Sequence, residues 1–271
     1  MKLLAILFLV CSLNAEATTS AALYNFTDAK MEAAVREDQI VPIASITKLF
    51  TAMAVIDSGV DLNELIVVKG STKGRFPNNA RVSRIELIKA MLIASDNRAA
   101  DSLAHAHPGG YSAFIKYVNE HISDIGLKNT RIEDASGIGA GNVSTARDLV
   151  DFVWWLRRYT LITQISSAHS EQVEFDNHKN KTVTLQVRNT NPDIANYDIL
   201  ISKTGFTSRA GRCLVMLVKH NDTMFAVAVL GEKSSKNRSQ SIKNLIYNKE
   251  YNDKSISRPR KVYASLRSDS R

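Results

Sequence analysis

Strand-like segments lie near both ends of the chain. Close to the N-terminus they are residues 21–26 and 31–36. Beyond residue 170, apolar and polar residues alternate in "TVTLQVRN" (182–189). Residues 213–231 form two apolar runs joined by a turn at His220-Asn221-Asp222. These segments predict strands at both ends of the chain.

The middle of the chain has apolar residues at helical spacing instead. Expected helices run from about Ser45 to Ser58, from the capping box Ser83–Glu86 to "ASDN", over about 98–106, through Phe114–Ile122 to a stop near Gly126, over about 145–159 and, after the strands, over about 237–247. The first of these is more apolar than a surface helix, so we expect it at the centre of the domain.

Strands at both ends around a helical middle predict an α+β fold. The simplest arrangement is one antiparallel sheet built from both ends of the chain, with helices on its two faces (an α/β/α sandwich) and an inserted helical lobe. A length of 271 residues, 44% of them hydrophobic, suits one large domain or two modest ones. No internal repeat is present in the sequence. We expect the folded domain to cover residues 18–251.

The N-terminus reads as a secretory signal peptide over residues 1–17, "MKLLAILFLVCSLNAEA". Lys2 precedes an apolar run that ends in an A-x-A cleavage site. This run is shorter than the roughly 20 residues that span a bilayer, although a retained membrane anchor is the alternative. We therefore expect a soluble protein exported to the periplasm.

The charge is concentrated at the other terminus. Half of the formal net charge of +8 lies in residues 252–271, where six Lys or Arg face two Asp in a Ser-rich segment. Such a composition predicts a disordered tail. The tail could contact anionic wall polymer or a lipid surface, or simply be solvated.

Metal, nucleic-acid and disulfide signals are weak. His105 and His107 lie near a helix end without acidic neighbours, so we expect no metal there. No zinc-finger, nucleic-acid-binding or dinucleotide motif occurs, and no nucleic-acid partner is expected. Cys213 lies in a strand-like apolar run and is expected to be a buried structural thiol.

Lys48 is unusual in "IASITKLFTAM", because the first turn of a helix disfavours a cation. Ser45 lies three residues earlier, which places a hydroxyl beside the amine on a helix surface. The helix dipole and burial would both lower the pKa of Lys48, and a neutral amine can accept the proton of an attacking serine. Alone, this S-x-x-K pattern is common.

Ser95-Asp96-Asn97 falls in a break between two predicted helices. Its hydroxyl and amide could relay a proton and bind a peptide, while an ordinary helix N-cap is the alternative.

Lys203-Thr204-Gly205 ends the apolar run "YDILISKTGFT". Outward Lys and Thr could bind a carboxylate, and Gly allows a close backbone approach. A simple strand-to-turn exit is the alternative.

Together these three patterns are specific, because S-x-x-K, S-D-N and K-T-G occur in this order in penicillin-binding proteins and class A β-lactamases. The segments "PIASITKLFTAM", "SDNRAADSLAHAHPGGYSAFI", "NVSTARDL" and "SKTGFTSRAGRCLVM" resemble the D-alanyl-D-alanine carboxypeptidase family of penicillin-interacting serine peptidases, especially its endopeptidase branch. The resemblance covers about Ala21 to Lys249 and implies the serine β-lactamase/transpeptidase-like fold.

The resemblance also implies roles for the matching residues. Ser45 would be the acylated nucleophile, Lys48 its general base and Ser95 the relay that delivers the proton to the leaving amine. The backbone amides of Ser45 and Phe206 would form the oxyanion hole. Acylation followed by hydrolysis with water needs no cofactor.

Substrate binding is implied for the remaining motif positions. Asn97 would hold the substrate amide, and Lys203 and Thr204 would bind a terminal carboxylate beside Gly205. The implied substrates are peptidoglycan stem peptides cut at a D-Ala-D-Ala or D-Ala-diaminopimelate bond, with β-lactams as inhibitors. Many carboxypeptidases of this family have a β-rich second domain and a C-terminal anchor, for which the sequence after the last expected helix is too short. We therefore expect the endopeptidase type.

Some positions leave alternatives open. Arg209 and Arg212 follow the third motif and could contact a second carboxylate or be solvated. A class A β-lactamase would require a Glu-x-x-x-Asn loop, but Gly137 stands four residues after Glu133. A non-catalytic penicillin-binding or wall-scaffolding protein is a further alternative.

Overall fold

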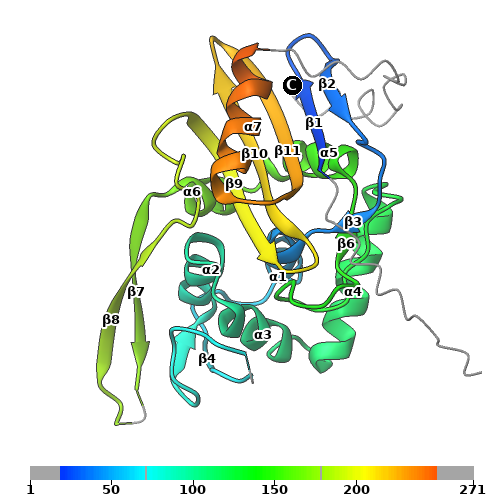
Figure 1. Cartoon of the computed structure of the whole chain (residues 1–271). Coiled ribbons are helices and arrows are strands. Elements are labelled where there is room, and N and C mark those ends of the chain that lie inside the picture. Colours follow the sequence, from blue (N-terminus) through cyan, green and yellow to red (C-terminus); the bar gives the residue numbers. More distant parts are fainter. Residues whose placement is uncertain (1–18, 71, 178, 249–271) are drawn as a thin grey trace, which may run out of the picture.

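The largest sheet of the molecule joins the two ends of the described chain (Figure 1). The computed structural model describes residues 19–70, 72–177 and 179–248. This five-stranded antiparallel sheet has the order β2-β1-β11-β10-β9. Its strands are β1 (Ser20–Asn25), β2 (Lys30–Val35), β9 (Asp198–Thr207), β10 (Gly211–His220) and β11 (Thr223–Glu232). Ser20 pairs with Leu230, so the predicted sheet built from both ends is confirmed.

Helices cover both faces of this sheet, because successive residues of its strands point to opposite faces and both sets are apolar. Cys213, Val215 and Leu217 of β10 belong to the larger core cluster, together with apolar residues of α5 (Ala146–Leu156). The alternate β10 residues face the other way and pack in a second cluster against α7 (Ser235–Asn248). The α/β/α layering and the α+β class predicted from the sequence are therefore confirmed.

The helical lobe is arranged around α1 (Thr47–Asp57), where every residue from Thr47 to Val55 is buried. Phe50 of α1 stacks on Phe152 of α5, with ring centroids 3.7 Å apart. The other helices outside the sheet layers are α2 (Arg84–Ile93), α3 (Asn97–His105), α4 (Gly110–Asp124) and α6 (Thr160–Ser167). The predicted central position of the first helix is confirmed.

Several elements differ from the sequence prediction. The helix expected to begin at Ser45 opens with a 3-10 turn, η1 (Ala44–Ile46), so Ser45 is not its cap. The segment "TVTLQVRN" does not extend the main sheet. It forms β8 (Thr182–Arg188), which pairs with β7 (Ser170–Asp176) as a projecting hairpin in a second sheet, β4-β5-β7-β8 (Figure 1).

Four strands of two or three residues were not predicted, because such lengths carry no readable period. They are β3 (Val41–Pro42), β4 (Leu65–Val67), β5 (Arg81–Ser83) and β6 (Val143–Ser144). Strands β3 and β6 pair with each other next to the start of η1. They therefore hold the chain just before Ser45.

The predicted signal peptide (1–17) and basic tail (252–271) lie outside the described residues. Within the described ranges, no helix is both long and apolar enough to cross a membrane. Cys213 is fully buried, and burial raises the pKa of its thiol to about 11, which confirms the expected structural thiol.

Candidate active site

The three sequence motifs meet in one cleft of about 510 Å³ between β9 and the helical lobe. η1 supplies Ser45, the connection from α2 to α3 supplies Ser95, and α3 begins at Asn97. The residues that line the cleft are Ser45, Ser95, Asn97, Thr190, Pro192, Thr204, Gly205, Phe206, Arg212, Ser235 and Arg238. The structure thus brings together positions up to 193 residues apart in sequence, from Ser45 to Arg238.

Lys48 lies fully buried beside Ser45 and has three hydrogen-bond partners. Its Nζ is 2.8 Å from Ser45 Oγ, and it donates to Asn97 Oδ1 at 2.7 Å and to the Ser136 carbonyl at 2.5 Å. The amide oxygen and the carbonyl can only accept, so they occupy two N–H groups of the amine. The position toward Ser45 Oγ is then the one where a neutral amine presents its lone pair.

The electrostatic setting of Lys48 favours that neutral amine. Burial lowers its pKa from 10.5 to about 7, although the carboxylates of Asp134, Asp101 and Asp96 act in the opposite direction. Burial prevails because removing an ammonium from water is costly and these carboxylates only partly compensate. Near neutral pH, a substantial fraction of Lys48 can therefore accept a proton.

The second motif divides its work among its three residues. Asp96 is the N-cap of α3 and accepts from the Ala99 backbone N–H at 2.9 Å, so the capping interpretation is correct for this residue. Ser95 adopts a left-handed conformation with φ of +58°. Such a conformation in a residue other than glycine is strained and is frequent at functional sites. Ser95 and Asn97 are left to line the cleft.

The third motif is placed on β9, at the edge of the main sheet. Lys203 is almost fully buried, so the expected outward position of this lysine is wrong. Burial together with nearby Lys48 lowers the pKa of its amine. Thr204 Oγ1 is 2.6 Å from Thr190 Oγ1, which fixes the threonine at the cleft wall. A Cβ on Gly205 would lie 2.8 Å from the Ile43 carbonyl and 3.1 Å from Ser45 N. Gly205 therefore allows β9 to approach the backbone of η1.

A loop that the sequence analysis missed holds Lys48 from the other side. The Asp134 carboxylate accepts from the backbone N–H groups of Ser136, Gly137 and Gly139 at 2.6–2.9 Å. These hydrogen bonds keep the pKa of Asp134 below its usual value despite burial. They also fix the Ser136 carbonyl that accepts from Lys48.

The same loop packs tightly against the turn of Ser45. Gly137 has a φ of +83°, and a Cβ there would lie 2.1 Å from the Ala44 carbonyl oxygen. Ala44 itself has a φ of +48°, immediately before Ser45. The strained backbone of Ala44 therefore lies directly before Ser45, and the packing of Gly137 against it holds this conformation in place.

Arg238 is a further cleft residue that the sequence analysis missed. It comes from the first turns of α7, is only 3% exposed, and its Nε has no hydrogen-bond partner among the described residues. Burial lowers its pKa, and the nearby Asp193 carboxylate partly opposes this effect. A buried guanidinium with an unused donor that lines a cleft is suited to an anionic ligand.

The two arginines after the third motif have different positions. Arg212 lines the cleft, and its guanidinium lies 3.6 Å from the ring centroid of Phe206, which is half exposed. Arg209 is exposed and is absent from the residues that line the cleft. Only Arg212 is therefore placed to contact a bound ligand.

Two other sequence candidates have structural partners elsewhere. Glu133 accepts from the Gly141 N–H at 2.7 Å within the Asp134 loop and does not line the cleft. His105 and His107 pack against the α4 rings of Tyr111 and Phe114, respectively. No group of three His, Cys, Asp or Glu side chains is placed to share a metal ion in the described ranges.

Comparison with known proteins gives one consistent family. Residues 12–234 match the model of the family described as D-alanyl-D-alanine carboxypeptidase. The chain is 40% identical over 223 residues to a D-alanyl-D-alanine endopeptidase of Escherichia coli (strain K12), a match that covers 79% of this chain and 71% of that protein. The resemblance stated from the sequence motifs is therefore confirmed.

Solved structures extend the similarity to the fold. The Streptomyces K15 DD-transpeptidase superposes with a TM-score of 0.80 at 20% identity, covering 86% of this chain and 97% of that chain. Penicillin-binding protein D2 of Listeria monocytogenes in an ampicillin-bound form gives 0.74 at 22% identity, with coverage of 85% and 96%. The expected serine β-lactamase/transpeptidase-like fold is confirmed.

Proposed function

This chain belongs to the D-alanyl-D-alanine carboxypeptidase family of serine peptidases, and we propose that it cleaves peptidoglycan stem peptides through an acyl-enzyme on Ser45. The observation that carries this proposal is the buried Lys48 amine, which is 2.8 Å from Ser45 Oγ and has a pKa of about 7. Residues 18–251 would form the catalytic domain.

Acylation begins with proton transfer from Ser45 to the neutral Lys48 amine. Ser45 Oγ then forms a bond to the carbonyl carbon of the scissile amide, and the C–N bond breaks as the tetrahedral intermediate collapses. The leaving amine receives its proton from Lys48, with the Ser95 hydroxyl as relay. A water molecule then attacks the acyl carbon, the bond from that carbon to Ser45 Oγ breaks, and Ser45 recovers its proton. These steps require no cofactor.

The developing oxyanion would be stabilised by the backbone N–H groups of Ser45 and Phe206. The close approach of β9 to η1 at Gly205 supports this assignment, because it places the two backbone segments next to each other. Donors held in position before the reaction are often the largest single contribution to acyl-transfer catalysis.

Substrate recognition would use Thr204 and Arg238, which line the cleft, together with Lys203, which is buried next to Thr204. Lys203, Thr204 and Arg238 would bind the carboxylate beside the scissile bond, and its charge offsets the desolvation of both cations. Asn97 accepts from Lys48 through Oδ1, so its Nδ2 is the group that would donate to a substrate carbonyl.

We further propose that the scissile bond lies in a peptide cross-link. The relative at 40% identity is an endopeptidase, which favours endopeptidase over carboxypeptidase action. The predicted signal peptide supports a location in the periplasm, where cross-linked peptidoglycan is accessible. Penicillins and other β-lactams would acylate Ser45 as substrate analogues, as the family suggests, and the basic tail could contact the wall.

The test compares the mature protein with its Ser45→Ala variant on fluorescent penicillin, cross-linked muropeptide dimers and pentapeptide monomers. We expect a persistent penicillin adduct and dimer cleavage with the wild type alone. Full muropeptide activity in Ser45→Ala would refute the mechanism. Rapid penicillin turnover without an adduct would indicate a β-lactamase, and an adduct without peptide cleavage would indicate a non-catalytic binding protein.

A further inference from the structure

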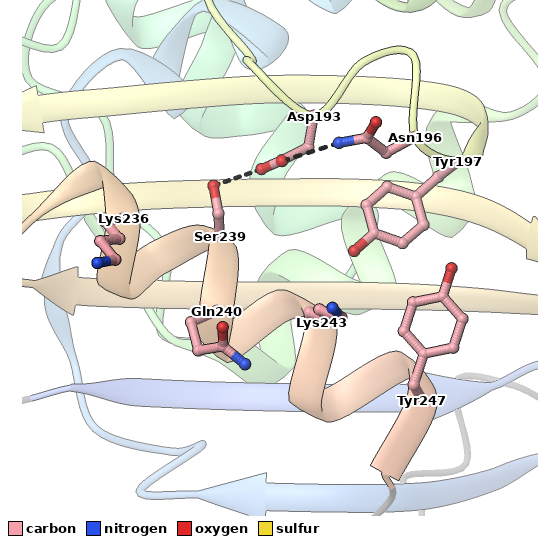
Figure 2. Close-up of a pocket in the computed structure, with 8 residues that line it drawn as sticks. All are labelled: Asp193, Asn196, Tyr197, Lys236, Ser239, Gln240, Lys243 and Tyr247. Atoms are coloured by element: carbon pink, nitrogen blue, oxygen red, sulfur yellow. Dashed lines mark hydrogen bonds between the residues drawn. The ribbon is translucent and has the colours of Figure 1, made fainter.

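A second hollow of about 380 Å³ lies along α7 (Figure 2). Its lining residues are Asp193, Asn196, Tyr197, Lys236, Ser239, Gln240, Lys243 and Tyr247, and we call it the α7 groove. None of these residues lines the cleft that contains Ser45. The α7 groove is therefore a separate candidate binding site.

The groove and the cleft are built from the same two segments of chain. In the connection before β9, Pro192 lines the cleft and Asp193 lines the groove. In the first turns of α7, Arg238 lines the cleft, whereas Lys236 and Ser239 line the groove. The cleft and the groove therefore lie next to each other, with neighbouring residues of both segments lining one or the other.

Hydrogen bonds hold one wall of the groove in place. Asp193 accepts a hydrogen bond from Ser239 Oγ at 2.5 Å and from Asn196 Nδ2 at 3.2 Å (Figure 2). The Ser239 bond attaches the connection before β9 to α7, and the Asn196 bond lies within that connection. The Asp193 carboxylate keeps its negative charge, because both donors are neutral, but these bonds occupy it at the wall. With Lys236 and Lys243, the groove therefore carries a net positive charge.

The remaining side chains suit an extended anionic peptide. Lys236 and Lys243 are exposed and lie seven residues apart on α7, a rise of about 10.5 Å. An extended peptide covers that distance with about three residues. Tyr197 and Tyr247 face each other at the far end, with ring centroids 6.1 Å apart, and offer flat amphipathic surfaces (Figure 2). His220 packs edge-on against Tyr247 and holds it in place.

We propose that the α7 groove binds the amine-side peptide of a cross-linked substrate, the strand that is released when Ser45 is acylated. This inference rests on the proposed function. A pentapeptide monomer ends at the carboxylate held by Lys203, Thr204 and Arg238. The leaving strand of a cross-link continues past that carboxylate, and its own carboxylates would meet Lys236 and Lys243. The groove would therefore select cross-linked dimers over monomers.

The experiment uses a Lys236→Ala/Lys243→Ala variant of the mature protein, which leaves the cleft residues unchanged. Its control, Lys116→Ala/Lys128→Ala, removes the same charge from exposed positions at α4 and just after it. The readouts are kcat and KM for purified cross-linked muropeptide dimers, the same constants for pentapeptide monomers, and the rate of penicillin acylation.

The groove variant should raise KM for dimers about five- to tenfold, because two exposed ion pairs together contribute that much at low salt. Its monomer hydrolysis and penicillin acylation should stay within about twofold of the wild type, and the control should match the wild type on all three. Added salt should raise the wild-type KM for dimers but have little effect on the variant.

Two results would overturn the assignment while the proposed function stands. One is a groove variant that cleaves dimers with the wild-type KM. The other is an equal loss on dimers, monomers and penicillin, which would mean that the change disturbs the cleft. A wild-type protein that is acylated by penicillin yet cleaves no peptide would instead overturn the proposed function, and the groove assignment with it.

Discussion

The pKa of Lys48 makes the pH dependence of acylation a quantitative test of the mechanism. If only the neutral amine accepts the Ser45 proton, a pKa of about 7 makes roughly 9% of the protein competent at pH 6 and roughly 91% at pH 8. The acylation rate should then rise about tenfold between these values and level off above pH 8. A lysine with the ordinary pKa of 10.5 would give a rise of about a hundredfold with no plateau.

The assay is the first-order rate of acylation at saturating fluorescent penicillin, measured by rapid quench from pH 5.5 to 9. Saturation matters because Lys203 also has a lowered pKa, and losing its charge would affect binding before the chemical step. A rate that climbs log-linearly to pH 9 would refute a neutral Lys48 base. Circular dichroism over the same range checks that the fold is retained.

The same pKa makes a prediction for stability. Between about pH 7 and 10.5 the unfolded chain holds a proton on Lys48 that the native protein has lost. The unfolded state therefore binds more protons, and the contribution of Lys48 to the free energy of unfolding should rise with pH across this window. Urea midpoints of the wild type and Lys48→Met, compared at pH 7 and 9, measure this contribution. A difference between them that does not change with pH would contradict the lowered pKa.

Three substitutions test other parts of the site and its support. Arg238→Gln should reduce kcat/KM about ten- to a hundredfold for peptides with a terminal carboxylate, by loss of a charge-assisted hydrogen bond, and should spare their amidated analogues. Gly137→Ala should lower the free energy of unfolding by more than Gly126→Ala, which has a similar positive φ but open space and should lose about 1–2 kcal/mol; urea denaturation of both measures the clash. Arg147→Ala should lose about 3–5 kcal/mol in the same assay, because the Glu37 carboxylate, 2.7 Å from the guanidinium, would stay buried without that partner.

Local patterns in the sequence were sufficient for most of the fold. Two apolar runs joined by a turn located β10 and β11, and the capping box at Ser83 located the start of α2, where Ser83 accepts from the Glu86 N–H. The 3-10 turn at Ser45 was not predictable, because it depends on contacts with the Asp134 loop and β9. Strand β8 was predicted from its alternating residues, but such a pattern cannot assign a strand to one of two sheets.

The motif residues were identified from order and spacing, but their supporting partners were not. Asp134 acts through backbone N–H groups, which leave no mark on residue types. Arg238 lies in a polar helical segment where one more arginine is unremarkable, and only the fold places it in the cleft. Both became visible once burial and hydrogen bonds were known.

The buried Cys213 can serve as a chemical probe for opening of the β9–β10 edge of the main sheet. It pairs with Gly205 across β9 and β10, so the strand that carries the third motif cannot separate without uncovering sulfur. Cys213 is the single cysteine of the described ranges, and its thiol resists ionisation while it is covered. The rate at which a maleimide or disulfide reagent modifies Cys213 would therefore report how often this edge of the sheet opens. The rate with and without a penicillin on Ser45 would measure how far acylation closes it.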